Sequence, residues 1–477
     1  MKRTTVGLVM LLAGAAPLAA QHPEIGSRVT AQIGSKFTDA DCSLKEGHYL
    51  VSSAKTKLSS YASVSDPVIG ARLLKEGVGI LDDAITTKDQ KKNPAAWYWL
   101  GRTELLRGEL GGADSAFTRA ASLAPQCAKD IQHYRTRAWA AMVVAAQGAS
   151  EAKQQDSAGY FFHQAILIDR DAPHAFSGLA GIMLDNKQTD SAIAYFGMAA
   201  ATNPTDSNYV KVRNRAAYNY AALLLNSQRN QEAIAAFHRY LSFEPTDDQA
   251  LKGLAQAFRG AGMLDSAGAV EKKLLAASGG EGGEAGSGLT DRELQELGGR
   301  QYNDKNYAEA AKTFGLLLQR NPNLRDALFA QANSYLALSD GAGLASAASK
   351  LVEIDPLGEY NYKMLAQGYK FTNDQAKVAE AIIGEFALPV DLQFGDFAAT
   401  ASEATFTAKA VGREARDENN KVLAPHPVTI TVEALAKDGT VVGSADATIP
   451  ALKPGEEAPV SVKVPGGPAA AWRYKVK

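Results

Sequence analysis

Apolar side chains recur with two different spacings, which divide the chain into a long helical part and a shorter β part. Up to residue 388, apolar and small residues recur every three or four positions, and this spacing predicts amphipathic helices. From Pro389 onward apolar residues alternate with other residues, which predicts strands with one buried face. The alternation is clearest in two triplets: Val428, Ile430 and Val432, and Val460, Val462 and Val464. The sequence therefore predicts a mostly α chain that ends in about six strands.

One pattern of small, aromatic and proline residues repeats through the helical part. In residues 94–127 its members are Trp97, Leu100, Gly101, Ala113, Phe117, Ala120 and Pro125. The pattern begins again at Pro173, Asn214, Asp248, Asp291, Arg325 and Glu359, and a weaker copy lies at 133–172. This spacing resembles the tetratricopeptide repeat (TPR), with about eight units. The resemblance implies an α-solenoid, a superhelix of helical hairpins that bury their apolar faces against one another.

Side-chain size explains the repeated positions. In a TPR hairpin the two helices approach closely where side chains are small, so we expect Gly101 in the first helix to face Ala113 in the second. Phe117 is expected to fill the groove between successive hairpins. Pro125 ends the second helix, because proline cannot extend one.

Breaks in the pattern define the expected segments. Residues 44–61 and 67–86 predict two helices that cap the array. The run 278–288, SGGEGGEAGSG, predicts a flexible linker, because it lacks the lysine and the preceding strand of a phosphate-binding loop. The expected order is a signal peptide (1–20), an N-terminal helical cap (21–93), TPR block one (94–277), the linker (278–288), TPR block two (289–388) and a β-sandwich-like domain (389–477).

Turn signals support the β part. Asp438-Gly439 stands between two alternating runs and predicts a hairpin. Lys453-Pro454-Gly455 predicts a second turn before the next strand. The order of strands and turns resembles the immunoglobulin-like domains that are appended to bacterial envelope proteins. The resemblance implies a small all-β immunoglobulin-like sandwich.

An export signal is predicted at the start of the chain. Lys2 and Arg3 precede an apolar run over residues 6–18, and Ala19 and Ala20 form a small-residue cleavage site. The alternative is a membrane anchor, but the apolar run is shorter than the ~20 residues that a spanning helix needs. We therefore expect cleavage near Ala20 and an exported chain, periplasmic or secreted, without a transmembrane segment in its mature form.

The sequence contains two cysteines, Cys42 and Cys127. A disulfide between them would suit an oxidising compartment. It would tie the N-terminal helices to the end of the first repeat. The alternative is two buried or free thiols, and the spacing suits no metal motif.

Composition and motifs argue against several functions. The net charge of −2 gives no basic field for nucleic acid. The seven histidines are scattered, without a His-Glu-x-x-His motif or paired metal spacing. The sequence also lacks a Gly-x-Ser-x-Gly elbow. It therefore predicts no catalytic residue, no metal site and no cofactor, and a protein that is not an enzyme.

Binding is the remaining route to function. In a TPR superhelix the first helix of each hairpin lines the concave face. The resemblance implies a peptide-binding groove at these positions: Tyr98, Arg102, Tyr218, Asn226, Lys252, Arg259, Tyr302, Asn333, Lys363 and Lys370. Several are basic or aromatic, so we expect an extended or acidic peptide as ligand, and the alternative is a solvated helix face. The family's carboxylate clamp is not reproduced, since Asn333 lacks its companions in neighbouring repeats.

Three hypotheses of function follow. The first is an exported scaffold or adaptor that binds a partner protein or peptide in the groove, while the β domain contacts a second partner, the cell surface or a glycan. The second is a structural component of a cell-envelope or secretion assembly, in which the repeats stack laterally. The third, an enzyme, needs a site that the sequence does not display. The fold alone does not choose between them.

Overall fold

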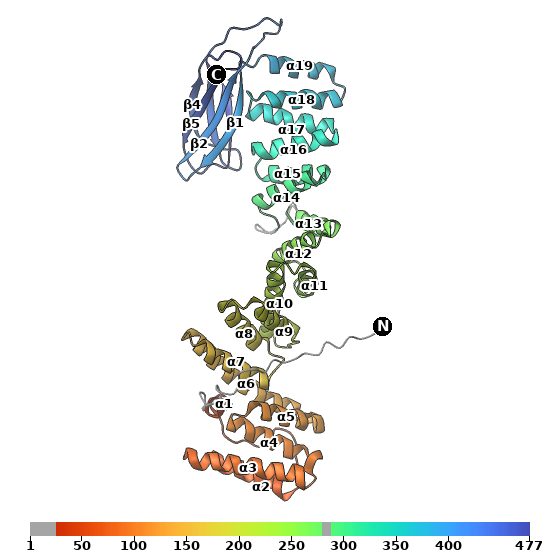
Figure 1. Cartoon of the computed structure of the whole chain (residues 1–477), viewed down its shortest axis with the longest axis vertical. Coiled ribbons are helices and arrows are strands. Elements are labelled where there is room, and N and C mark those ends of the chain that lie inside the picture. Colours follow the sequence, from red (N-terminus) through yellow and green to blue (C-terminus); the bar gives the residue numbers. More distant parts are fainter. Residues whose placement is uncertain (1–24, 279–287) are drawn as a thin grey trace. The chain divides into compact units, whose positions relative to one another are not determined.

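The computed structural model describes residues 25–278 and 288–477, which form two compact units (Figure 1). The first unit ends at Val270 and the second begins at Glu271. The expected signal peptide lies outside the described residues, and so does most of the expected linker. The helical block that precedes the strands belongs to the same unit as the strands.

The first unit is a series of helices joined by short turns. Its helices are α1 (Ile25–Ile33), α2 (Tyr49–Ala62), α3 (Pro67–Thr87), α4 (Pro94–Arg107), α5 (Leu110–Leu123), α6 (Ala128–Glu151), α7 (Gln155–Ile168), α8 (Pro173–Asp185), α9 (Thr189–Ala201), α10 (Ser207–Asn226), α11 (Asn230–Leu241), α12 (Asp248–Gly260) and α13 (Leu264–Ser278), which runs into the second unit. Consecutive helices from α4 onward pair into hairpins, as the repeat pattern predicts. Polar caps set several helix starts: the side chains of Asp66 and Asn93 each accept a backbone N–H of the helix that follows.

The N-terminal region differs from the prediction in two ways. Helix α1 was not expected, and it packs against α4 and α6 with Val29 fully buried. Helix α2 begins at Tyr49 instead of residue 44, because Gly47 takes a left-handed conformation with φ 66° and His48 caps the helix. Residues 34–48, which connect α1 to α2, are called the strap below.

The second unit continues the hairpins and ends in two sheets. Its further helices are α14 (Asp291–Asn303), α15 (Tyr307–Arg320), α16 (Arg325–Leu338), α17 (Gly341–Ile354), α18 (Glu359–Phe371) and α19 (Gln375–Phe386). Its strands are β1 (Val390–Ala399), β2 (Glu403–Gly412), β3 (Val428–Leu435), β4 (Val441–Ile449), β5 (Glu457–Pro465) and β6 (Ala471–Val476). Within the described residues, the strands form two antiparallel sheets of three, in the orders β1-β2-β5 and β4-β3-β6. This confirms the predicted fold class, a mostly helical TPR-like solenoid followed by a small all-β region.

The two sheets enclose an aromatic core. Trp472 on β6 stacks on Phe394 of β1 with ring centroids 4.8 Å apart, and it meets the ring of Phe406 edge-on. Alternate residues of β2 and β5 are buried, which is the pattern that the spacing of apolar residues predicts. This core also takes in Leu357 and Leu388 from the helical block, so the sandwich and the block share one hydrophobic cluster.

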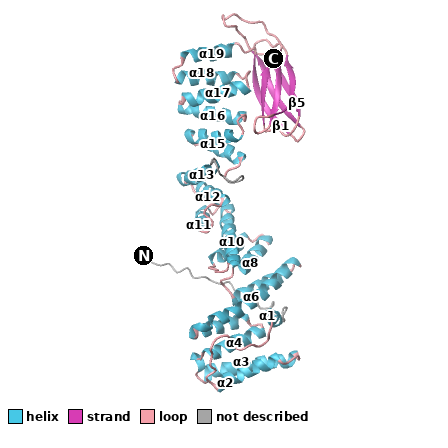
Figure 2. Cartoon of the chain, turned by 180° about the vertical axis from the view of Figure 1, so that it is seen from behind, coloured by secondary structure: helices cyan, strands magenta, loops and turns pink. Residues whose placement is uncertain are grey.

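The sandwich lies along the row of loops between the hairpins of the second unit, and Figures 1 and 2 show the strands beside α15–α19. We call this contact the seam. Its main polar pairs are Lys437 with Asp291 (2.5 Å), Asn321 Nδ2 with the Ala470 carbonyl (3.1 Å), Tyr474 OH with Asp355 (2.6 Å), the Glu359 N–H with Asp391 (2.9 Å), and Arg413 with Glu359. The pairs begin at the start of α14 and continue to α18. The β part is therefore bound to the array over several repeats.

The seam is expected to weaken in acid. Burial raises the pKa of Glu359, but its ion-pair partners Arg413 and Lys363 outweigh burial and hold this pKa below its usual value of 4.5. In the same way, Lys437 and Arg320 hold the pKa of Asp291 below its usual value of 3.8. Groups with a lowered folded pKa stabilise the fold above the unfolded pKa, and this contribution is lost as pH falls through the folded pKa. The urea midpoint of the second unit should therefore fall as pH drops below about 4. The double variant Asp291→Asn/Glu359→Gln should show a flatter pH dependence, and an equal slope in both proteins would contradict the assignment.

Glycines allow close helix contacts. A Cβ at Gly101 would lie 2.6 Å from the ring of Phe117, so this glycine lies against an aromatic ring. The same relation recurs in α14, where a Cβ at Gly298 would lie 2.8 Å from the Phe314 ring. The aromatic residue of the second helix thus packs directly on the glycine of the first.

Alanine substitutions at two neighbouring glycines, Gly298 and Gly299, should change the free energy of unfolding in opposite directions. Gly298→Ala pushes a methyl group into the buried Phe314 ring and should lower the free energy of unfolding by about 1–3 kcal/mol. At Gly299 a Cβ would meet no atom within 4 Å, so Gly299→Ala should raise it by about 0.5–1 kcal/mol through the lower entropy of the unfolded chain. Urea denaturation of the two variants measures both effects. A loss of stability in both would show that the helix does not tolerate alanine for some reason other than the ring.

Candidate functional site

The predicted groove residues are divided between the two units. In the first unit Tyr98 and Arg102 lie on α4, Tyr218 and Asn226 on α10, and Lys252 and Arg259 on α12. In the second unit Tyr302 lies on α14, Asn333 on α16, and Lys363 and Lys370 on α18. Tyr98 and Arg102 share a helix, as do Tyr218 with Asn226, Lys252 with Arg259, and Lys363 with Lys370.

Tyr98 and Arg102 do not line an open groove. Tyr98 is fully buried and its hydroxyl donates to Asp130 at 2.5 Å, while Arg102 is only 2% exposed. Burial raises the pKa of Tyr98 far above its usual range, so the hydroxyl keeps its proton. The guanidinium of Arg102 stacks over Tyr134 of α6 at 3.7 Å. The strap and α6 cover this face of α4, so neither side chain is open to solvent here, and a peptide-binding role for them stays a prediction.

The predicted groove residues on α10 and α12 are partly covered by neighbouring side chains of the first unit. Tyr218 is half-buried, and its ring meets Tyr240 edge-on at 5.4 Å. Burial raises the pKa of Tyr218. Asn226, the last residue of α10, is exposed, whereas Lys252 and Arg259 are half-buried. Of these four side chains, Asn226 is therefore the most open to solvent.

The predicted residues of the second unit are also engaged in part. Tyr302 packs edge-on against Tyr307 at 5.2 Å. The side-chain amide of Asn333 donates to the Phe329 carbonyl of its own helix at 3.0 Å. Lys363 forms an ion pair with Glu359, and this hydrogen bond raises the pKa of Lys363. Lys370 is exposed near the end of α18. That these four residues line one peptide-binding groove therefore stays a prediction.

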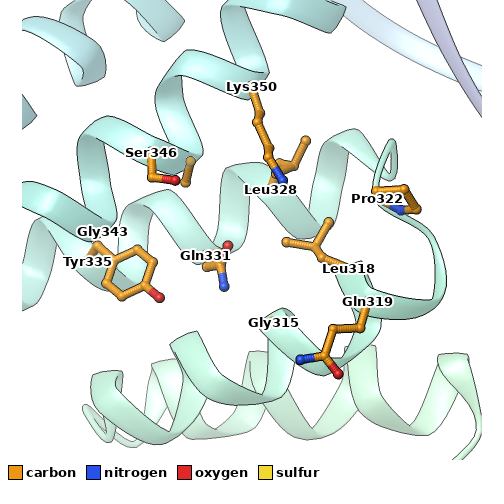
Figure 3. A pocket seen from close by; sticks show the side chains of 11 residues that line it. Gly315, Leu318, Gln319, Pro322, Leu328, Gln331, Tyr335, Gly343, Ser346 and Lys350 are labelled. Carbon is orange, nitrogen blue, oxygen red and sulfur yellow. The ribbon is translucent and has the colours of Figure 1, made fainter.

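A pocket of about 490 Å³ lies instead across α15, α16 and α17 (Figure 3). It is lined by Gly315, Leu318, Gln319 and Pro322 from α15 and the loop after it, by Leu328, Gln331 and Tyr335 from α16, and by Gly343, Ser346, Ala347 and Lys350 from α17. The second helices of two successive hairpins form its walls, and the first helix between them forms its floor. The predicted groove residues are not among the residues that line it.

The polar groups of the pocket are suited to a peptide. Gln319 and Gln331 place side-chain amides beside the central space, with the Tyr335 hydroxyl at one side and Lys350 at another (Figure 3). Gln331 is held in place because its Nε2 donates to the Ala311 carbonyl at 3.0 Å. Burial raises the pKa of Tyr335, so its hydroxyl remains a hydrogen-bond donor at neutral pH. Amides and hydroxyls can pair with a peptide backbone, and Lys350 can pair with a carboxylate.

Small residues keep this pocket open. Gly315, Gly343, Ser346 and Ala347 contribute little side-chain volume to the walls. A Cβ at Gly343 would lie 2.6 Å from the Tyr335 ring, so the glycine makes room for that ring. The sequence signal was the glycine- and alanine-rich run at 341–348, which is unusual for the outer face of a helix. The prediction missed the pocket because it considered only the first helix of each hairpin.

In residues 25–278 and 288–477 no group of three or more histidine, cysteine, aspartate or glutamate side chains is placed to hold a metal ion. No helix in the same ranges has the length and apolar character needed to cross a bilayer.

Comparisons with known proteins give likenesses of fold. No protein family matches this sequence, and no curated protein matches it either. Among solved structures, the C-terminal part of a TPR repeat-containing protein from Cytophaga hutchinsonii is 16% identical, with a TM-score of 0.31, and the match covers 51% of this chain and 93% of that one.

Two other solved structures show the same kind of likeness. The TPR2AB domain of yeast Sti1, in a complex with pHSP90, is 14% identical with a TM-score of 0.27, over 52% of this chain and 89% of that one. YrrB, described as a TPR protein with an unusual peptide-binding site, is 14% identical with a TM-score of 0.23, over 56% of this chain and 97% of that one. These neighbours are TPR proteins, and this chain is an array of helical hairpins followed by two small sheets.

Proposed function

We propose that this chain is an exported scaffold for other proteins, which holds an extended segment of a partner in the α15–α17 pocket. The observation that carries the proposal is the pocket itself, with its walls of small residues and its amide, hydroxyl and ammonium groups. Its volume of about 490 Å³ falls within the ~300–1,000 Å³ typical of ligand sites.

The neighbouring sandwich adds rigidity to this site. The loop between α15 and α16 and the loop after α17 both belong to the seam, through Asn321 and Asp355. A pocket whose walls are held by a second domain loses less conformational freedom when a ligand binds. The β part therefore supports the pocket, in addition to any contact that it makes with the cell envelope.

A substitution that fills the pocket tests the proposal. Ser346 is exposed and lines the pocket, so Ser346→Trp should block it without disturbing the buried core of α17. Ser349 is an exposed serine on the same helix outside the pocket, and Ser349→Trp is the matched control. Peptides selected from a random display library on the whole protein should bind Ser346→Trp at least about tenfold more weakly than wild type, and Ser349→Trp with unchanged affinity.

The proposal fails if selected peptides bind both tryptophan variants equally well, or if the folded protein selects no peptide. A peptide that carries a carboxylate should also bind more weakly to Lys350→Gln, because that variant removes the cation of the pocket. Fluorescence anisotropy with labelled peptides measures each affinity.

A further inference from the structure

The strap lies across the face of the first hairpins that the sequence predicts to bind peptide. The ring of Phe37 stacks on Trp99 of α4, with centroids 5.8 Å apart and planes at 18°. The next residue, Thr38, places its hydroxyl 2.8 Å from the Tyr134 hydroxyl of α6. The strap thus contacts the first helices of two successive hairpins, α4 and α6, as an extended peptide bound there would.

Charges and backbone groups continue this resemblance to a ligand. Arg102 directs Nη1 at the Thr38 carbonyl, 3.4 Å away. Lys55 of α2 forms ion pairs with Asp39 at 2.6 Å and with Glu46 at 2.9 Å, and its ammonium lies 5.3 Å from the centroid of the Trp99 ring. The groove therefore offers an aromatic platform and two cations, and the strap fills it with an aromatic ring, a backbone carbonyl and carboxylates.

A disulfide fastens the strap, and a glycine with a left-handed backbone stands near each of its ends. The disulfide between Cys42 and Cys127 ties it to the turn before α6, with the two Cα atoms 5.3 Å apart. Gly34 and Gly47, near its two ends, have φ of 77° and 66°, conformations that glycine adopts readily. Thr38 and Asp39 remain exposed to solvent.

The strap covers one face of a helical core. Helices α4, α5 and α6 pack around a core that includes Leu105, Phe117 and Ala138, each fully buried, and Phe37 of the strap packs on the same core. Trp99, Arg102 and Tyr134 lie on the face that the strap covers, so removing the strap would uncover them.

We propose that this surface is a binding site for an extended acidic peptide with an aromatic anchor, and that the strap occupies it in cis. The ligand has an aromatic side chain followed two residues later by a carboxylate, the order of Phe37 and Asp39. The site lies in the first unit, and the α15–α17 pocket belongs to the second. The disulfide holds the strap in place and keeps the site closed to other chains.

The strength of this closure can be estimated from the tether. A tethered ligand competes at an effective concentration on the order of 1 mM. An external copy of the strap with an intrinsic Kd of about 10 μM would therefore bind the closed protein about 100-fold more weakly than the vacated site. Mutations that release the strap should therefore raise the affinity of the protein for the external peptide toward that of the vacated site.

The test uses a fluorescein-labelled peptide of residues 34–46 that carries Cys42→Ser, with binding measured by anisotropy. The released variant, Phe37→Ala/Cys42→Ser/Cys127→Ser, should bind this peptide at least about tenfold more tightly than wild type. A control peptide with the additional change Phe37→Ala should lose that binding. Adding Ser346→Trp to the released variant should change nothing, so this site and the pocket can fail separately.

Folding of the released variant is checked by far-UV circular dichroism. If it is folded and binds the peptide no better than wild type, the strap is ordinary packing and the proposal is overturned. Equal binding of both peptides also overturns it. If the triple variant does not fold, the single variant Phe37→Ala, which keeps the disulfide, is measured in its place. It should still bind the peptide more tightly than wild type. An affinity equal to that of wild type would overturn the proposal.

Discussion

Replacing both cysteines with serine, Cys42→Ser/Cys127→Ser, will lower the free energy of unfolding of the first unit by about 4.5 kcal/mol, the loop-entropy value for a closed loop of 85 residues. The reason is that the disulfide restricts the unfolded chain between the strap and the turn before α6. Loss of the strap contacts on Trp99 adds to the effect if the strap detaches.

Chemical denaturation under non-reducing conditions, with wild type and variant side by side, measures this change. The second unit lacks the disulfide, so its transition should stay where it is in wild type. Reduction of wild type with a dithiol should reproduce the shift in the first unit and leave the variant unchanged. A variant as stable as wild type would mean that the disulfide does not form in the folded protein.

The second large effect is expected at Asp355, in the centre of the seam. Asp355 is 1% exposed and accepts hydrogen bonds from Tyr474 OH at 2.6 Å and from Arg325 Nε at 3.1 Å. Asp355→Ala leaves a half-buried guanidinium and a fully buried hydroxyl without their acceptor. Removing one partner of a buried ion pair costs about 3–5 kcal/mol, and we expect a loss of this size in the second unit.

A neighbouring carboxylate provides the matched control. Asp326 lies 3.6 Å from the same Arg325, but its side chain is 64% exposed. Asp326→Ala should therefore change stability by no more than about 0.5 kcal/mol, because solvent screens an exposed pair. Near-UV circular dichroism follows the seam, since Trp472 stacks within the sandwich next to Tyr474. Equal losses for the two variants would show that Asp355 is not the centre of the seam.

The repeat pattern was sufficient to predict the helical hairpins. Its signal is local: the spacing of Gly101 and Phe117 within one hairpin determines which side chains meet. Helix α1 was missed because only its contacts with α4 and α6 explain it, and a Cβ at Gly26 would lie 2.1 Å from the Leu106 carbonyl oxygen. Such a close approach joins Gly26 to Leu106, which is distant in the sequence, and no local spacing encodes it.

The groove was predicted less well than the fold for the same physical reason. The pattern identifies the outward face of α4, but it does not show what covers that face. The cover is the strap, whose contacts to Arg102 and Tyr134 span 64 and 96 residues. The seam also depends on contacts between residues that are distant in sequence, since Tyr474 and Asp355 are 119 residues apart. Long-range pairings of this kind depend on the assembled array.

The long reach of the strap also has a consequence for the order of folding. Hairpin contacts in a repeat array are local in sequence and form quickly, whereas a contact across 96 residues must first overcome the entropy of closing a long loop. We expect the hairpins of the first unit to stack before the strap docks, and the thiols of Cys42 and Cys127 to meet only at that late step. A refolding experiment that traps free thiols at successive times should then find native-like helix content while both cysteines are still reduced.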